Sequence, residues 1–457
     1  YFLRTKYSHS ISKCYVDTNY DFKINYKFHL YFKKTFNVFF KKIRMIIYII
    51  RDGDPAVIYR LLLKFFYNFF VVFLTPLFLP FILFIRLISP IYKINIGLII
   101  SERIGHFAGN TDIYMTNKFK NKFNLNTLDL FALNYPICNK FLLSLIKRKI
   151  ILLPHLFGKS AFLCNSLVPF KKLNQVEVNQ YSDRDLFNLL DETPPNFSFT
   201  DSEESEGLAF LSSLGIKPND KFICLNVRDD AYLREALPWW DWSYHDYRNC
   251  EVSNYKQAAI TLANLGYYVF RMGVKVNKPF DIDHPNIFDY ATNGMRSEFL
   301  DVYLGAKCTF AISNGTGFDA IPYVFRRPIL FVDHVPLSII YTFSKRFLIT
   351  TKKIWSKKLE RFLTFEESFS CGVAKDLSGD LNKYDGELVL VESNNEEINN
   401  YAIEMHERLN NIRIETKEDE ERQRKFWEIF QNNPTLHGDL RAHFSSTFLK
   451  KNKKLLE

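Results

Sequence analysis

The most regular part of the chain begins near residue 200, where apolar strands alternate with helices. Thr200 and Glu203 form a capping-box pattern that predicts a helix over 201–214, which ends at Gly215. We expect strands over 222–228, 267–273, 287–291, 308–313 and 328–333, and helices over 254–265, 296–306 and 317–325. Asn254 and Gln257 are a possible cap pair for the second helix. Near-continuous apolar strands alternating with helices predict a parallel sheet covered on both faces, as in a Rossmann-like domain.

A second set of strands precedes this region. Residues 94–101 (INIGLIIS) are typical of a buried parallel strand, and 125–133 and 147–154 are further strand candidates. We therefore predict an α/β protein with two Rossmann-like domains of the GT-B type. The predicted divisions are an N-terminal extension (1–90), an acceptor domain (91–200), a donor-binding domain (201–385) and a C-terminal helical segment (386–457).

The N-terminal extension is basic first and apolar afterwards. Residues 1–64 contain 13 Lys and Arg against 4 Asp and Glu, and Phe65–Ile85 follows with 21 residues that carry no charge. That run is long enough to cross a bilayer, although Pro76 and Pro80 favour a kinked or re-entrant hairpin. The alternative is a pair of buried helices in a soluble domain. The first residue is not Met, which favours a fragment or a misplaced start, and we assign no fold to residues 1–64.

Charge and cysteine content narrow the partners and the compartment. Because most of the net charge of +10 lies before the apolar run, it indicates a membrane surface rather than a nucleic acid. Seven scattered cysteines without a C-x-x-C pair are typical of reduced thiols in the cytoplasm. We expect a cytoplasmic protein that is peripheral or monotopic at the inner membrane.

Polar residues follow three of the strands expected in the second domain. In an open parallel sheet, ligands bind at the carboxyl ends of the strands. Two glycines around a hydroxyl, followed by a helix, suit a phosphate, and strand-end arginines suit a diphosphate, although a plain tight turn also accounts for such a loop. The predicted donor- and phosphate-binding residues are Arg228, Arg271, Gly273, Ser313, Asn314, Gly315, Thr316, Gly317 and Asp319.

Two residues are candidates for a catalytic base. His106 follows the first strand and would face the cleft between the domains, where its ordinary pKa near 6.5 suits proton transfer. The alternative is a histidine that caps a helix or bonds a buried carbonyl group. Asp229 is the competing candidate, and its alternative is an ion pair with Arg228 or Arg248.

Several enzyme classes lack their motifs in this sequence. No G-x-G-x-x-G follows the first strand of either domain, which argues against nicotinamide and flavin oxidoreductases. No P-loop, G-x-S-x-G or H-E-x-x-H motif occurs. We expect no metal and no cofactor, with a nucleotide-sugar as co-substrate.

The sequence resembles a bacterial family of proteins assigned as glycosyltransferases. The resemblance covers most of residues 95–370 and is carried by the L-x-V-R-D motif at 225–229 and the S-x-G-x-G-F-D motif at 313–319. In that family His often stands where this chain has Asn226, which puts a catalytic role at that position in doubt. Arg228 is also similar in place to an arginine of fucosyltransferase-like GT-B enzymes that contacts the donor diphosphate, a likeness at the level of fold.

These observations predict a glycosyltransferase that moves a sugar from a nucleotide-sugar to a hydroxyl of a glycan or lipid-linked acceptor, in the synthesis of cell-surface polysaccharide. One alternative is a pyruvyl-transferase-like enzyme on the same architecture. The other is a membrane-associated binding protein without catalysis.

Overall fold

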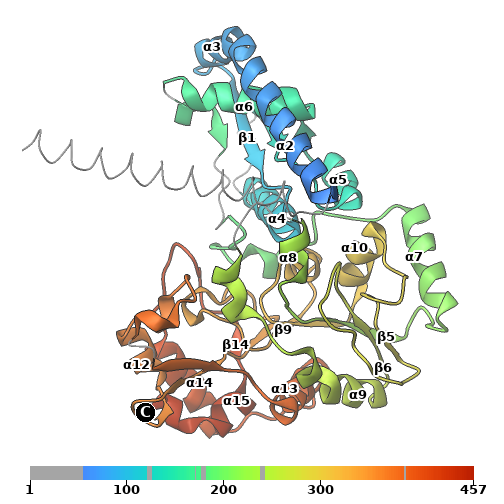
Figure 1. The fold of residues 1–457 in the computed structure, drawn as a ribbon, viewed down its shortest axis with the longest axis vertical. Coiled ribbons are helices and arrows are strands. Elements are labelled where there is room, and N and C mark those ends of the chain that lie inside the picture. The colour runs from blue at the N-terminus through green and yellow to red at the C-terminus, as the bar shows by residue number, and fades with distance from the viewer. Residues whose placement is uncertain (1–54, 121–125, 170, 177–181, 237–241, 385–386) are drawn as a thin grey trace, which may run out of the picture. The chain divides into compact units, whose positions relative to one another are not determined.

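The structure is a computed structural model that describes residues 55–457, apart from 121–125, 170, 177–181, 237–241 and 385–386. The chain divides into two units, 1–62 and 63–457. Only residues 55–62 of the first unit are described, so most of the basic segment predicted at 1–64 lies outside the described residues. All that follows concerns the second unit (Figure 1).

The first sheet has four parallel strands in the order β3-β2-β1-β4. Its strands are β1 (Lys93–Ile99), β2 (Thr127–Leu133), β3 (Ile151–Leu152) and β4 (Gln175–Val176). Buried apolar side chains of β1 and β2 alternate with small residues, and Gly97 lies against the ring of Phe131. This sheet confirms the three strands predicted before residue 155. Its helices are α4 (Ile104–Lys120), α5 (Lys140–Lys147) and α6 (His155–Leu167).

The second sheet has seven parallel strands in the order β14-β10-β9-β8-β5-β6-β7. It confirms the parallel sheet predicted after residue 200. Its strands are β5 (Lys221–Asn226), β6 (Tyr267–Arg271), β7 (Ile287–Phe288), β8 (Phe310–Ser313), β9 (Ile329–Phe331), β10 (Phe347–Ile349) and β14 (His443–Phe444). Its helices include α7 (Asp201–Ser213), α8 (Ala231–Ala236), α9 (Lys256–Asn264), α10 (Glu298–Lys307), α11 (Ala320–Val324) and α13 (Asn395–Leu409).

Local predictions hold at some helix ends and fail at others. The Thr200–Glu203 capping box at α7 is confirmed, since both of its hydrogen bonds are present. The cap pair Asn254–Gln257 is wrong, because a short 3₁₀ helix (Val252–Tyr255) leads directly into α9 and its N-cap, Tyr255, makes no side-chain cap bond.

The C-terminal segment contributes strands as well as helices. A three-stranded antiparallel sheet, β12-β11-β13, consists of β11 (Lys353–Ser356), β12 (Arg361–Phe362) and β13 (Leu388–Val391). The strand β14 pairs with β10 of the second sheet. The helices α12 (Phe365–Ser370), α14 (Lys417–Ile429) and α15 (Ser446–Lys451) complete this region. Residues 386–457 are thus part of the folded body rather than a separate helical appendage.

The apolar run forms α2 (Pro55–Leu74), a 3₁₀ turn (Thr75–Phe78) and α3 (Leu79–Leu87). Pro76 and Pro80 lie at the starts of the second and third pieces, yet the chain does not fold back on itself (Figure 1). By length and composition, one helix among the described residues could cross a membrane, Ile58–Leu87, and 22% of its apolar window is buried.

Candidate functional site

A pocket of about 1010 Å³ lies where the carboxyl ends of the strands of the second sheet face the first turn of α4. The first sheet's loops contribute Arg103, Ile104, Cys138 and Asn139 to its wall. The second sheet contributes residues that follow β5, β6 and β8, among them Asn226, Arg228, Asp229, Gly273, Thr316 and Gly317. The pocket therefore lies at the strand ends where a parallel sheet is expected to bind its ligand.

Hydrogen bonds tie together the loops that carry the polar wall. The Asn314 side chain accepts a bond from the Arg228 backbone N–H (2.8 Å) and donates to the Arg248 carbonyl oxygen (3.1 Å). The Arg248 guanidinium donates to the Gly315 carbonyl oxygen (2.5 Å), and the Cys250 N–H donates to the Arg228 carbonyl oxygen (3.0 Å). Asn314 is thus a brace that sets two arginines relative to the glycine loop.

Three arginines, Arg103, Arg228 and Arg248, gather at this place without carboxylate partners. Within the described residues none of them forms an ion pair, and the Nε atoms of Arg228 and Arg248 are buried without a hydrogen bond. Burial lowers the pKa of Arg228 to about 10, and the positive charges of Arg248 and Arg103 lower it further in the same direction. Such a cluster favours an anion, because a bound negative charge would offset both the burial and the repulsion.

The glycine loop after β8 has the geometry that its sequence indicates. Gly315 has a φ of 79°, and a Cβ there would lie 2.9 Å from the ring of His334, so a larger residue would be both strained and crowded. Thr316 caps the following 3₁₀ helix (Gly317–Asp319), and Asn226 donates to the Thr316 hydroxyl (2.5 Å). Thr316 and Gly317 are the members of the loop that line the pocket.

The other predicted members of this loop lie beneath it. Ser313, Asn314 and Asp319 are buried, and Asp319 accepts a hydrogen bond from the Thr316 N–H (2.6 Å). Burial raises the pKa of Asp319 to about 6, while bonds from Ser313 and Thr316 act in the opposite direction. These side chains hold the loop rather than line the pocket.

Arg271 and Gly273 separate in space although they are close in sequence. Gly273 lines the pocket. Arg271 is 1% exposed, donates to Asp289 (3.2 Å) and to the Lys278 carbonyl oxygen (3.1 Å), and is absent from the pocket wall. The structure therefore places the Arg271 guanidinium in an internal ion pair and not beside Arg228.

The two base candidates differ in what surrounds them. Asp229 lines the pocket, but its carboxylate accepts the N–H groups of Ala231 (3.1 Å) and Asn277 (2.8 Å) instead of pairing with Arg228 or Arg248. His106 lies in the first turn of α4, and its Nδ1 atom has no hydrogen-bond partner among the described residues. Burial lowers the pKa of His106, and Arg103 lowers it further, so the ring is neutral at pH 7.

Sequence reasoning missed Arg103, Arg248 and Asp301 as members of the site. Arg103 precedes His106 by three residues, so its place in the same loop was a usable clue. Asp301 lines the pocket from α10, where it binds Tyr290 and Arg296, and burial raises its pKa to about 6. Nothing in the local pattern distinguishes Arg248 from other surface arginines. Among the described parts of the chain, no group of three or more His, Cys, Asp or Glu side chains is placed to hold a metal ion.

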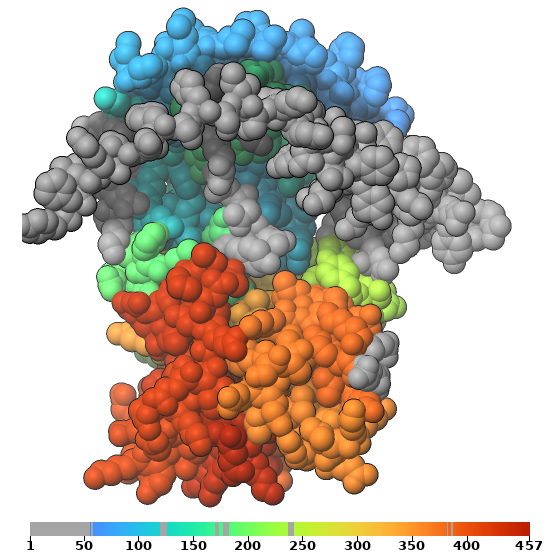
Figure 2. All heavy atoms as spheres, turned by 90° about the vertical axis from the view of Figure 1, so that its left-hand side faces the viewer, coloured from blue at the N-terminus to red at the C-terminus, as the bar shows by residue number. Residues whose placement is uncertain are grey.

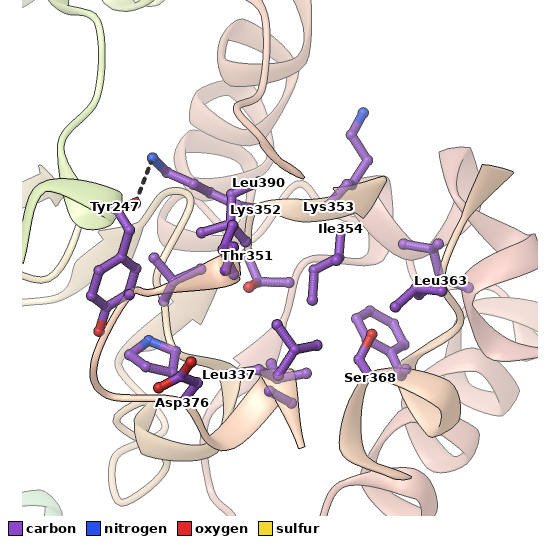
Figure 3. A pocket seen from close by; sticks show the side chains of 18 residues that line it. Tyr247, Leu337, Thr351, Lys352, Lys353, Ile354, Leu363, Ser368, Asp376 and Leu390 are labelled. Carbon is purple, nitrogen blue, oxygen red and sulfur yellow. Dashed lines mark hydrogen bonds between the residues drawn. The ribbon is translucent and has the colours of Figure 1, made fainter. Parts of the chain in front are cut away.

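A second, mostly apolar pocket lies behind the loop that carries Arg248. Figure 3 shows the Lys352 side chain directed at the backbone of Tyr247, to which its Nζ atom donates (3.1 Å). Lys352 also donates to the Asn249 carbonyl oxygen (2.6 Å) and pairs with Glu392 (3.3 Å). The buried ammonium group thus binds the residues on both sides of Arg248 and fixes the turn in which that arginine lies.

Comparison with known proteins gives structural likenesses and no sequence relatives. No family model matches the chain. No curated protein matches it either. The chain is similar to the ADP-heptose lipopolysaccharide heptosyltransferase II of E. coli, with 12% identity, a TM-score of 0.36, and coverage of 56% of this chain and 90% of that one.

Two further solved structures are similar. A glycosyl transferase family 9 protein from Veillonella parvula is 11% identical with a TM-score of 0.38, over 62% of this chain and 89% of that one. The E. coli heptosyltransferase WaaC, solved with ADP, is 10% identical with a TM-score of 0.28, over 56% and 91%. All three similar proteins are glycosyltransferases by name. Because every TM-score is below 0.5, these likenesses assign neither a fold family nor an activity to this chain.

Proposed function

We propose that the protein is a GT-B-type glycosyltransferase that transfers a sugar from a nucleotide-sugar to a hydroxyl of a glycan or lipid-linked acceptor. The observation that carries this proposal is the cluster of Arg103, Arg228 and Arg248, which have no carboxylate partner and meet at the strand ends of a parallel sheet. A diphosphate is a ligand of matching charge, and the exposed backbone of Gly317 allows it a close approach.

In the proposed reaction the acceptor oxygen attacks the anomeric carbon of the sugar. The bond from that carbon to the phosphate oxygen breaks, and its electron pair leaves with the nucleoside diphosphate. Arg228 and Arg103, which line the pocket, would stabilise the negative charge that develops on the leaving group, with Arg248 behind them. The arginines would thereby fill the place of a metal ion, and no cofactor is needed beyond the nucleotide-sugar.

The acceptor proton goes to a base, and we propose His106 for this role with Asp229 as its competitor. Both oxygen atoms of Asp229 already accept backbone N–H groups, which stabilises the carboxylate and makes it a weaker base. His106 is neutral and keeps one ring nitrogen without a partner among the described residues. Gly273, Thr316 and Gly317 would contact the donor, and Ser313, Asn314, Gly315 and Asp319 would hold the loop. We do not assign Arg271 a donor contact.

The test is a ligand screen on the full-length chain. Thermal unfolding is followed with UDP-, GDP-, ADP-, CMP- and dTDP-sugars and with phosphoenolpyruvate. We expect one nucleotide class to raise the melting temperature of the wild type. Arg228→Met should lose this shift without a change in the melting temperature of the unliganded protein. Arg361→Met is the matched control, since that exposed arginine pairs with Glu367 away from the pocket.

Other outcomes decide between the alternatives. A shift with phosphoenolpyruvate alone would replace the proposal with the pyruvyl-transferase reading. No shift with any ligand would favour a binding protein without catalysis. An unchanged shift in Arg228→Met would remove the arginine cluster as the donor site.

We also propose that the protein works at the cytoplasmic face of the inner membrane, in cell-surface polysaccharide synthesis. Support comes from the basic composition of residues 1–64 and from the apolar helix that follows. No nucleic-acid partner is proposed.

A further inference from the structure

The helical segment from Leu63 to Leu87 is attached to the folded body along one side. Val71, Thr75, Ile82 and Ile85 are buried on that side. Ile82 and Ile85 pack with Ile96 of β1 and with Ala161 and Cys164 of α6. This stripe recurs every three or four residues, so a single face of the segment contacts the domain.

The remaining faces of the segment are apolar and open to solvent. Phe73 is 68% exposed, Leu77 71% and Leu87 78%, and Phe65, Phe69 and Phe84 are each more than half exposed. No charged residue interrupts the run from Phe65 to Ile85. In Figure 2 the blue spheres of this segment lie along an outer edge of its unit. A contiguous apolar patch of this size on a soluble protein marks a surface that is covered by a partner.

Polar bonds hold both ends of the segment to the same folded domain. At one end Lys64 pairs with Glu102 (3.3 Å). At the other end the Arg86 guanidinium donates to the carbonyl oxygens of Asn165 (3.1 Å) and Val168 (3.3 Å). Between them the Ser160 hydroxyl donates to the Val71 carbonyl oxygen (3.0 Å).

These bonds are incompatible with a helix that crosses a bilayer. A run of roughly 20 residues spans the hydrocarbon core, so the two ends of a spanning helix lie on opposite sides of the membrane. Here Lys64 and Arg86, which flank the apolar run, both contact one globular domain. A charged pair and two α/β layers would otherwise have to enter the hydrocarbon. The segment therefore lies along the domain.

We infer that the faces of residues 65–87 turned away from α6 form a membrane-docking surface that lies in the plane of a bilayer containing anionic lipid. The apolar side chains enter the boundary between headgroups and acyl chains, as in interfacial helices. Charge complementarity indicates the lipid class, since residues 1–64, directly before this surface, hold 13 Lys and Arg against 4 Asp and Glu. This inference stands independently of glycosyl transfer.

The first test measures binding of the full-length protein to lipid vesicles by co-sedimentation. Vesicles of phosphatidylcholine alone are compared with vesicles that contain about 30% phosphatidylglycerol. We expect binding to the anionic vesicles, weakened at about 0.5 M salt. The double variant Phe69→Ser/Phe73→Ser should lose binding roughly tenfold or more. The control Ile412→Ser/Ile414→Ser removes two exposed apolar side chains elsewhere and should bind like the wild type.

Three results would overturn the inference. They are equal binding to both vesicle types, full binding by the Phe69/Phe73 variant, and a concentration-dependent dimer that replaces vesicle binding and is lost in that variant. The last result would make a second copy of the chain the occupant of the surface.

The second test distinguishes lying on the membrane from crossing it. Epitope tags are placed before residue 1 and after residue 457, and inverted membrane vesicles are treated with protease. A surface in the membrane plane leaves both tags on the cytoplasmic side, so both are removed. Protection of the N-terminal tag alone would show a spanning helix and would overturn the inference, while the ligand screen on the arginine cluster would be unaffected.

Discussion

Gly105 and Gly317 approach each other backbone to backbone at the edge of the arginine pocket. A Cβ atom on Gly105 would lie 2.9 Å from the Gly317 Cα atom and 3.2 Å from its carbonyl oxygen. The first turn of α4, which follows the first sheet, therefore touches the 3₁₀ turn that follows β8 of the second sheet. This contact sets the distance between Arg103 on one side of the pocket and Thr316 on the other.

Gly105→Ala should destabilise the protein by about 1–3 kcal/mol, because neither backbone can move aside without repacking its helix. Gly317→Ala, whose Cβ would meet Gly105 N at 3.3 Å, should cost less. Urea unfolding of the full-length chain measures both changes. Equal stability of Gly105→Ala and the wild type would mean that the two helix starts are further apart than the structure shows.

Arg248→Met should weaken binding of the nucleotide identified in the screen by roughly 10- to 100-fold, which is about 1.4–2.8 kcal/mol. Its positive charge acts on Arg228, and its guanidinium is fixed by Gly315. Isothermal titration calorimetry at two salt concentrations measures the effect. The salt dependence should also be shallower in the variant, because one charge is gone. An affinity like that of the wild type would exclude Arg248 from the site.

Activity should fall on the acid side with a midpoint below the ordinary histidine pKa of about 6.5. The folded-state pKa of His106 is lowered by burial and by Arg103, so the ring is protonated only at lower pH, where it no longer accepts a proton. The pH profile of kcat/KM reports this group in the free enzyme.

The two base candidates differ in their effect on that profile. His106→Gln should remove the acid limb and lower kcat by about 10²- to 10⁴-fold. Asp229→Asn should keep the limb. If instead the limb survives in His106→Gln and disappears in Asp229→Asn, the base is Asp229.

Arg271→Met should affect stability and leave nucleotide affinity unchanged in the protein that remains folded. Removal of the guanidinium leaves the half-buried Asp289 carboxylate without its cation, a change that costs about 3–5 kcal/mol at fully buried pairs and less here. Denaturant unfolding together with calorimetry separates the two effects. Loss of affinity at unchanged stability would return Arg271 to the donor site.

The sequence by itself determined the parts of the fold that depend on neighbours along the chain. The Thr200–Glu203 cap, the buried run before β5 and the glycine loop at Gly315 follow from local rules: a side chain that reaches three residues, continuous apolar burial, and a positive φ. These features also indicated the correct end of the sheet for a ligand, since all parallel strands point their carboxyl ends to one edge.

Only the tertiary structure decided which arginines meet. Arg271 is the last residue of β6, and Asp289, just after β7, pairs with it, whereas Arg228 lies two residues beyond the end of β5 and reaches the pocket. Arg103 and Arg248 come from distant segments that Asn314, Lys352 and the Gly105–Gly317 contact hold in place.

The apolar segment shows the same division. Composition determined that residues 65–85 are apolar enough to enter a bilayer. Whether they cross it depends on Glu102, Asn165 and Val168, residues far along the chain whose bonds to Lys64 and Arg86 no local pattern encodes.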